Sequence, residues 1–113
     1  MKKGDFKKVI EHGRKFSSRY LLISVKPNGL PFSRLGIAIS KKIGNAVVRN
    51  RIKRRLREAV RKQLMEKLLQ YDFMITARSA AAEAAFADLN KVITDSLARL
   101  AHENNFNNTD KIV

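Results

Sequence analysis

The side chains best suited to chemistry in this chain are cationic, and they are concentrated between Ser40 and Lys62. This stretch contains ten of the chain's 24 Lys and Arg residues and only one acid, Glu58. As a helix, it would place five donors on one face: Asn50, Lys53, Arg54, Arg57 and Arg61. They would form a ribbon about 16 Å long, and a guanidinium group can contact phosphate through two parallel hydrogen bonds. The pattern predicts a surface that binds a nucleic-acid backbone.

A solvated charged face is the alternative interpretation. Solvated helices usually mix Glu with Lys, whereas residues 49–62 contain six Arg, two Lys and one Glu. A net charge of +14 also favours a polyanionic partner, because self-repulsion of that size weakens a small fold. An anionic membrane is the second possible partner, but no run approaches the roughly 18 apolar residues of a membrane span. We therefore expect a cytoplasmic protein that binds nucleic acid.

Other chemistries find little support in the composition. The chain contains no Cys, which excludes disulfides, thiolate zinc sites and a cysteine nucleophile. Its two histidines, His12 and His102, stand far apart without an acid at metal-ligand spacing, so we expect both at the surface. The ten acids are scattered and form no close pair of the kind that holds metal ions in nucleases. We expect no catalytic centre and no metal site in the protein itself.

The basic stretch has the start signal and the buried side of a helix. Asn45 can cap it by accepting a backbone N–H, and the pattern continues to about residue 69. Val48, Ile52 and Leu56 fall within one apolar stripe, which would pack against the rest of the domain. The stripe and the donor ribbon lie on opposite sides, so burial of one exposes the other.

The N-terminal segment predicts a short helix. Residues 5–12 place Phe6 and Ile10 on one apolar side, and Gly13 suits a left-handed stop. The following residues, 14–18, have the pattern of a loop.

Two strands should follow and pair as a hairpin. Residues 19–26 and 33–40 alternate with a period of two, and a turn with two prolines joins them. In the second strand, large apolar residues alternate with the small residues Gly36, Ala38 and Ser40. This small face predicts either a shallow groove beside the first helix or close packing of that helix on the sheet.

The C-terminal half predicts a buried strand, a core helix and a tail. Residues 71–78 form a nearly continuous apolar run, which is typical of a strand inside a sheet. Residues 79–100, capped by Ser79, carry apolar residues at helical spacing and should pack in the core. The Asn-rich residues 102–113 show no periodicity, so we expect a disordered tail after a single RNA-binding domain at residues 1–101.

RNA is favoured over DNA as the partner. DNA-reading modules usually pair the recognition helix with a second helix or dimerise through heptads, and the sequence shows neither pattern. A sheet beside a basic helix is typical of RNA-binding proteins, in which aromatic rings stack on unpaired bases. Phe6 is the best stacking candidate because it would overlook the small-residue groove.

The basic stretch also resembles the Arg-Asn-Arg signature of the bacterial ribonuclease P protein family, through the residues SKKIGNAVVRNRIKRRLRE. The resemblance continues in DFKKVIEHG, LGIAISKKIGNAV and YDFMITARSAA, and so covers the chain to about residue 100. In that family the protein is the small basic subunit of a ribonucleoprotein endonuclease, which removes the 5′ leader of precursor tRNA. The catalytic centre and its Mg²⁺ ions belong to the RNA subunit, which agrees with the absence of a protein active site.

The resemblance implies an α/β (α+β) two-layer sandwich with a small mixed β-sheet. A short N-terminal helix and a C-terminal core helix would accompany the sheet. The long basic helix would connect neighbouring parallel strands through a left-handed β-α-β crossover, against the usual right-handed rule.

The resemblance further implies two sets of RNA-contacting residues. The catalytic RNA would contact Lys41, Lys42, Asn45, Arg49, Asn50, Arg51, Lys53, Arg54 and Arg57, to which the donor ribbon adds Arg61. The single-stranded leader would lie in a central cleft lined by Phe6, Ile10, Ile23, Ala38 and Ser40. The alternation of residues 19–26 places Ile23 on the core face instead, so the two arguments disagree at this position.

The leading hypothesis is a non-catalytic subunit that binds ribonuclease P RNA in a 1:1 complex and grips the leader of precursor tRNA. A ribosomal or other structural RNA-binding protein would use the same basic face without recognising a leader. A protein-only nuclease would cleave with no RNA added.

Overall fold

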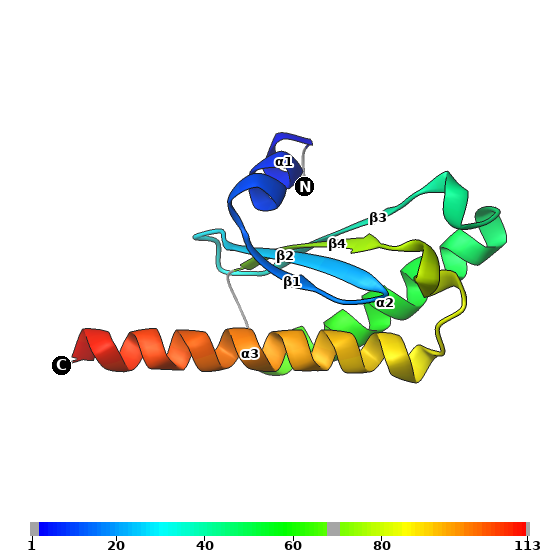
Figure 1. Cartoon of the computed structure of the whole chain (residues 1–113). Helices are drawn as coiled ribbons and strands as arrows, with labels where there is room; N and C mark the ends of the chain where they lie inside the picture. Colours follow the sequence, from blue (N-terminus) through cyan, green and yellow to red (C-terminus); the bar gives the residue numbers. More distant parts are fainter. Residues whose placement is uncertain (1–2, 68–70, 113) are drawn as a thin grey trace.

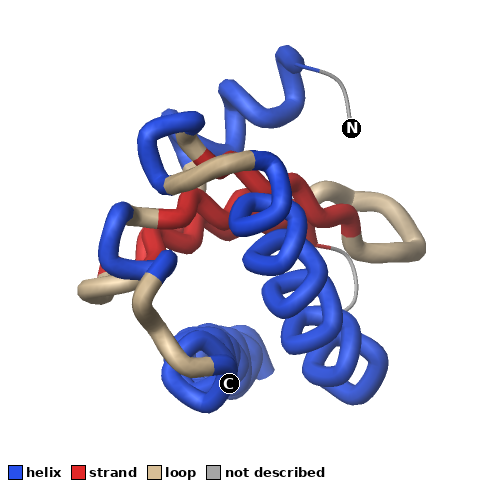
Figure 2. The backbone as a smooth tube through the Cα atoms, turned by 90° about the vertical axis from the view of Figure 1, so that its right-hand side faces the viewer, coloured by secondary structure: helices blue, strands red, loops and turns tan. Residues whose placement is uncertain are grey.

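The computed structural model describes residues 3–67 and 71–112, which fold into one β-sheet with helices on both faces (Figure 1). The helices are α1 (Lys3–His12), α2 (Ala46–Lys67) and α3 (Phe86–Ile112), with the short 3-10 helices η1 (Lys41–Ile43) and η2 (Ser79–Ala82). The strands are β1 (Arg14–Ser17), β2 (Leu21–Pro27), β3 (Arg34–Ile39) and β4 (Tyr71–Ala77). Helices α2 and α3 cover one face and α1 lies on the other (Figure 1, Figure 2). No helix within the described ranges is long and apolar enough to cross a membrane.

The strand order in the sheet is β1-β2-β4-β3. Strand β2 pairs antiparallel with β1 and β4, whereas β3 pairs parallel with β4. The predicted hairpin between residues 19–26 and 33–40 is wrong, because β4 lies between these strands. The apolar residues of β4 must be buried on both faces of the sheet, and the position between β2 and β3 allows this. Since α2 joins the parallel neighbours β3 and β4, the mixed sheet and the β-α-β crossover are confirmed, while the hand of the crossover stays a prediction.

Residues 14–18, predicted as a loop, contain the edge strand β1. Phe16 explains the difference, because its ring is only 4% exposed and the residue pairs with Ile23 of β2. The other three residues of β1 are exposed. Burial of the Phe16 ring therefore holds β1 against β2, although the sequence of β1 shows no alternation of apolar residues.

Gly13 does not adopt the predicted left-handed conformation. Among the described glycines only Gly29, with a φ of 67°, lies in the left-handed region. Gly13 instead permits a close approach of α1 to β2, because a Cβ there would collide with the carbonyl oxygen of Val9 and lie 2.9 Å from that of Val25. The residue is required for space rather than for its backbone angle.

The hydrophobic core lies between the sheet and the two helices α2 and α3. Its largest fully buried residues come from these helices and from the two central strands: Phe73, Leu21, Ile23, Leu56, Ile75, Leu89 and Ile93. The predicted stripe of α2 is confirmed, since Ile52 and Leu56 are buried and Val48 packs against the core. Asn45 caps this helix as predicted, with its Oδ1 accepting the Val48 N–H at 3.0 Å. The expected end near residue 69 lies outside the described residues.

Helix α3 begins at Phe86 rather than at Ser79, which starts η2 instead. The carboxylate of Asp88 accepts the N–H of Ala85 at 3.1 Å. This is half of a capping box, in which the third helical residue reaches back to the cap. Asp88, the third residue of α3, therefore fixes the start of this helix, and Ser79 does not.

The helix continues to Ile112 and so includes most of the tail that the sequence predicts to be disordered from residue 102. Asn residues lower helix propensity only modestly. Neither Gly nor Pro, the residues that stop a helix, occurs between Phe86 and Ile112.

Candidate nucleic-acid interface

The cationic side of α2 faces solvent, opposite its buried stripe. The exposed members of the predicted RNA-binding set are Lys41, Lys42, Asn45, Asn50, Arg51, Arg54, Arg57 and Arg61, and Lys53 is half-buried. Within the described residues, none of these cations forms an ion pair with an acid. The surface thus presents uncompensated charge, and the helical spacing that predicted it is confirmed.

Arg49 differs from the other arginines of this helix. The residue is half-buried, and its Nε is shielded from solvent with no hydrogen-bond partner among the described residues. Packing around the stem therefore limits the positions of its guanidinium group. A shielded donor gains more from a partner than an exposed one, so Arg49 is suited to one specific contact rather than to diffuse attraction.

On the other face of the sheet, α1 crosses the middle of the strands. Ser24, Met74 and Gly36 form one row across β2, β4 and β3, and all three are buried. The Phe6 ring covers Gly36 so closely that a Cβ at Gly36 would collide with it, and Val9 is buried beside it. Close packing, one of the two predictions for the small face, is therefore correct at Gly36. The helix divides this face into two parts.

One part is a row of half-buried residues, here called the open floor: Leu22, Thr76 and Ala38. Asp5 contacts Arg34 on the far side of α1 from the open floor. Phe6 and Ile10 are on the other flank of this helix and therefore lie next to the open floor. Ile10 is 41% exposed. Ser40 is exposed immediately after β3, so the open floor leads into η1 and the start of the basic helix.

Four of the five predicted cleft residues therefore surround the open floor, and the fifth, Ile23, does not. Ile23 is 2% exposed and lies on the opposite face, between Phe16 and Ile75 in the core. Successive side chains of a strand point to opposite faces, so Leu22, rather than Ile23, lies on the face that carries the open floor. The alternation of the sequence was the better guide here.

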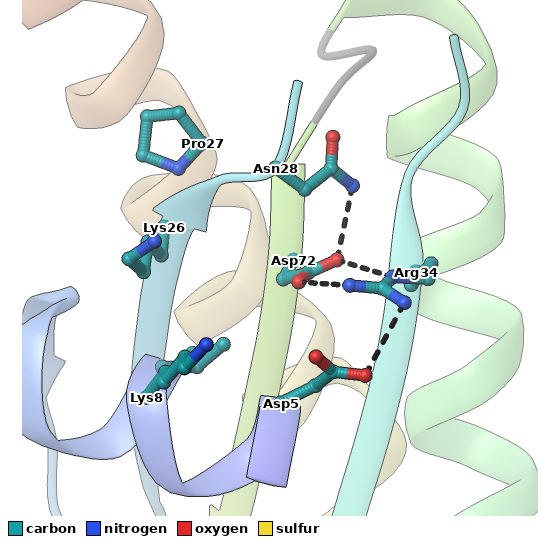
Figure 3. A pocket seen from close by; sticks show the side chains of 8 residues that line it. Asp5, Lys8, Lys26, Pro27, Asn28, Arg34 and Asp72 are labelled. Atoms are coloured by element: carbon teal, nitrogen blue, oxygen red, sulfur yellow. Dashed lines mark hydrogen bonds and ion pairs between the residues drawn. The ribbon is translucent and has the colours of Figure 1, made fainter. Parts of the chain in front are cut away.

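The second part of this face holds a charged cluster that the sequence did not predict (Figure 3). Arg34 donates to the Asp72 carboxylate from Nε at 2.8 Å and from Nη2 at 2.7 Å, and Asn28 donates to it at 2.9 Å. The Nη1 of Arg34 lies 3.5 Å from Oδ2 of Asp5. Since Asp5 belongs to α1, the cluster ties α1 to two strands. Arg34 and Asp72 stand 38 residues apart, and only the register of β3 and β4 reveals the pair.

This cluster makes the stability depend on pH. The side chain of Asp72 is 8% exposed, and its hydrogen bonds from Arg34 hold the pKa of its carboxyl below the ordinary value. The resulting stabilisation is complete above the unfolded-state pKa and is lost as the pH falls through the folded-state pKa. We expect Asp72→Asn to flatten the loss of stability below about pH 4 and to lower the stability at neutral pH, because Arg34 loses its carboxylate.

Urea unfolding between about pH 3 and pH 7 measures both effects. Asp95→Asn, at an exposed position of α3, is the matched control and should follow the wild-type curve. If Asp72→Asn loses stability at low pH as the wild type does, the Arg34–Asp72 pair does not set this pH dependence.

Comparison with known proteins places the chain in one family. A family model described as Ribonuclease P matches residues 1–101. The ribonuclease P protein component of Clostridioides difficile is 40% identical over 99 residues, 87% of each chain, and that of Caldanaerobacter subterraneus is 42% identical over 96 residues, 84% of this chain and 82% of the relative. The solved RNase P protein of Staphylococcus aureus is 30% identical with a TM-score of 0.79, covering 88% of this chain and 92% of that chain. The protein from Thermotoga maritima gives 27% and 0.75, with 84% and 90% covered.

Proposed function

The chain belongs to the ribonuclease P protein family, and we propose that it binds ribonuclease P RNA through α2 and the leader of precursor tRNA over the open floor. It is the protein component of an enzyme, ribonuclease P, rather than a ribosomal or other structural RNA-binding protein. The observation that supports this division of roles most directly is structural. The open floor ends at Ser40, and the exposed cations of η1 and α2, which form no ion pair within the described residues, follow directly after it.

Binding to the catalytic RNA would be dominated by electrostatics. Each phosphate neutralised by Lys or Arg releases counterions, so contacts to six phosphates give a slope of log K against log salt of roughly −4 to −5. Six exposed cations, Arg51, Arg54, Arg57 and Arg61 of α2 with Lys41 and Lys42 of η1, can supply these contacts without first breaking an ion pair within the described part of the protein. We place one protein on one RNA.

The leader would lie along the flank of α1 that carries Phe6 and Ile10. Single-stranded RNA is usually recognised through unstacked bases that pack on aromatic rings. Phe6 is half-buried and fixed by its packing on Gly36, so it offers a ring edge whose position is set before RNA binds. Because the open floor leads into η1, the leader and the catalytic RNA would meet near Ser40.

We assign the Mg²⁺ ions of the reaction to the RNA subunit. Among the side chains that the structure describes, no three His, Asp or Glu residues gather closely enough to hold a metal ion. The protein's own contribution would be positive charge beside the two RNAs, which lowers the phosphate repulsion between substrate and catalytic RNA.

A reconstituted reaction tests the proposal. Protein, ribonuclease P RNA and a precursor with a leader of several nucleotides are mixed at low Mg²⁺, and cleavage at the mature 5′ end is measured. We expect the protein to restore cleavage. We also expect Ala38→Leu, which fills the open floor, to weaken precursor binding about tenfold, or about 1.4 kcal/mol, without changing the affinity for mature tRNA.

Ala98→Leu is the matched control, because Ala98 is exposed on α3, away from the open floor. It should behave as wild type. Equal weakening of precursor and mature tRNA by Ala38→Leu would move the leader elsewhere on the protein, and cleavage by the protein without RNA would overturn the assignment of catalysis to the RNA.

A further inference from the structure

A second group of basic residues surrounds the edge strand β1 and is not part of the α2 face. This group, here called the β1-edge surface, consists of Arg14, Lys15, Arg19, Arg78 and Arg99, all exposed. They come from β1, the turn into β2, the end of β4, and α3. Strand β1 is one edge of the sheet and β3 is the other. Because α2 follows β3 and contacts it, the two cationic surfaces lie at opposite edges.

Three of the four arginines of this surface lie against aromatic rings. The guanidinium carbons of Arg14 and Arg99 lie 4.8 Å and 5.3 Å from the centroid of the Phe16 ring. That of Arg19 lies 5.7 Å from the Tyr20 ring centroid. Contact with a ring uses the flat face of a guanidinium group and leaves N–H donors at its edges. Such arginines lose less freedom when they bind phosphate than unrestrained ones do.

Two further cations complete the surface. Arg78 donates from Nη2 to the hydroxyl of Ser17 at 2.8 Å, and Lys15 lies between Phe16 and Arg14 along the strand. Within the described residues, Lys15, Arg19, Arg78 and Arg99 form no ion pair with an acid. Along α3, Asp95 stands four residues before Arg99 and Glu103 four residues after it.

A purely structural role explains only part of this arrangement. Charges on an edge strand discourage pairing with another chain, and arginines over Phe16 cover its ring. One charge would suffice for the first purpose, whereas five cations near a four-residue strand repel one another. Contact with a polyanion removes that repulsion.

We propose that the β1-edge surface binds a second stretch of RNA backbone, so that the protein holds RNA at both edges of its sheet. The inference rests on the proposed role as an RNA-binding subunit, but not on the leader cleft. The phosphates come from either the catalytic RNA or the body of precursor tRNA, and the experiment separates these sources.

The test removes three charges and keeps Arg14 over the ring: Arg19→Gln, Arg78→Gln and Arg99→Gln. One arm measures binding of the protein to ribonuclease P RNA at several salt concentrations, and the other measures binding of precursor tRNA to the assembled holoenzyme. For whichever RNA contacts the β1-edge surface, the slope of log K against log salt should become shallower by about 2 to 3 in the triple variant. The same three positions replaced by Lys should keep most of the slope.

Two controls make the result decisive. Replacing Lys7, Lys8 and Lys91 with Gln removes the same charge elsewhere and measures the effect of net charge alone. If the β1-edge variant changes neither arm by more than this control, the surface binds no RNA and the inference fails. The α2 variant discussed below is measured in parallel, so that failure of the proposed function itself would appear as an unchanged slope for both surfaces.

A crosslinking experiment does not depend on the stability of the triple variant. Since the chain has no cysteine, Lys15→Cys gives a unique attachment point for a photoreactive group at the β1 edge. Crosslinks to ribonuclease P RNA or to precursor tRNA in the holoenzyme would identify the source. Absence of RNA crosslinks from this position, with strong crosslinks from Arg57→Cys, would overturn the inference.

Discussion

Replacing Arg54, Arg57 and Arg61 with Gln should weaken binding to ribonuclease P RNA on the order of a hundredfold near physiological salt. The slope of log K against log salt should become shallower by about 2 to 3, because each lost phosphate contact removes roughly 0.7 to 0.9 of slope. The three residues are exposed and lie along one ribbon. The change leaves the buried stripe intact, so the fold should be retained.

Arg49 is deliberately left unchanged in this variant. Its Nε is shielded and its stem is packed, so its removal would alter packing and charge together. An Arg49→Ala variant should therefore lose affinity, while the salt slope becomes shallower by no more than the roughly 0.7 to 0.9 that a single phosphate contact contributes. The two variants separate diffuse electrostatic attraction from one positioned contact.

Filter binding or fluorescence titration over a range of salt concentrations measures both affinity and slope. The matched control is again Lys7, Lys8 and Lys91 to Gln, which has the same net charge but keeps the ribbon. If the ribbon variant and this control give the same slope, α2 does not face the RNA in the complex.

The sequence predicted α2 well because its signals are local. The side chain of Asn45 caps the next turn, and the positions of Ile52 and Leu56 fix which side is buried within a single helix. Exposure of Arg54 and Arg57 then follows without any knowledge of the other elements. The same reasoning placed Ile23 correctly in the core, because alternation along a strand is also local.

Pairing between distant segments was not predictable in this way. The position of β4 between β2 and β3 depends on burial of both its faces, and neither strand's own pattern specifies its neighbour. The pair formed by Arg34 and Asp72, and hence the anchoring of α1, exists only in that strand order. Phe16 shows the same limit, since its ring holds β1 in the sheet without any alternating pattern.

Gly36→Ala is expected to have the second large effect, because the added methyl group pushes directly against the Phe6 ring beside the open floor. A Cβ at position 36 would collide with Cε1 of Phe6 and lie 2.7 Å from Cδ1. Either the ring or the whole of α1 must move. Overpacking of this kind costs about 1–3 kcal/mol of stability. Displacement of Phe6 should also weaken precursor binding about tenfold, while binding of mature tRNA stays unchanged.

Combining this change with Phe6→Ala identifies the cause. Without the ring, the added methyl group has room, so Gly36→Ala should cost less in the Phe6→Ala background than in wild type. We expect a coupling of about 1–2 kcal/mol from urea unfolding of the four proteins in the cycle. Strict additivity would mean that the ring does not rest on Gly36 in solution.

Gly4→Ala supplies the control within the same helix. A Cβ at Gly4 would meet nothing within 4 Å, and replacing Gly by Ala in a helix usually stabilises it by about 0.5–1 kcal/mol. This variant should be slightly more stable and bind precursor as wild type does. Loss of leader binding in Gly36→Ala but not in Gly4→Ala would locate the effect at the contact between α1 and the sheet. Equal loss of mature tRNA binding would instead argue that the open floor holds some other part of the substrate.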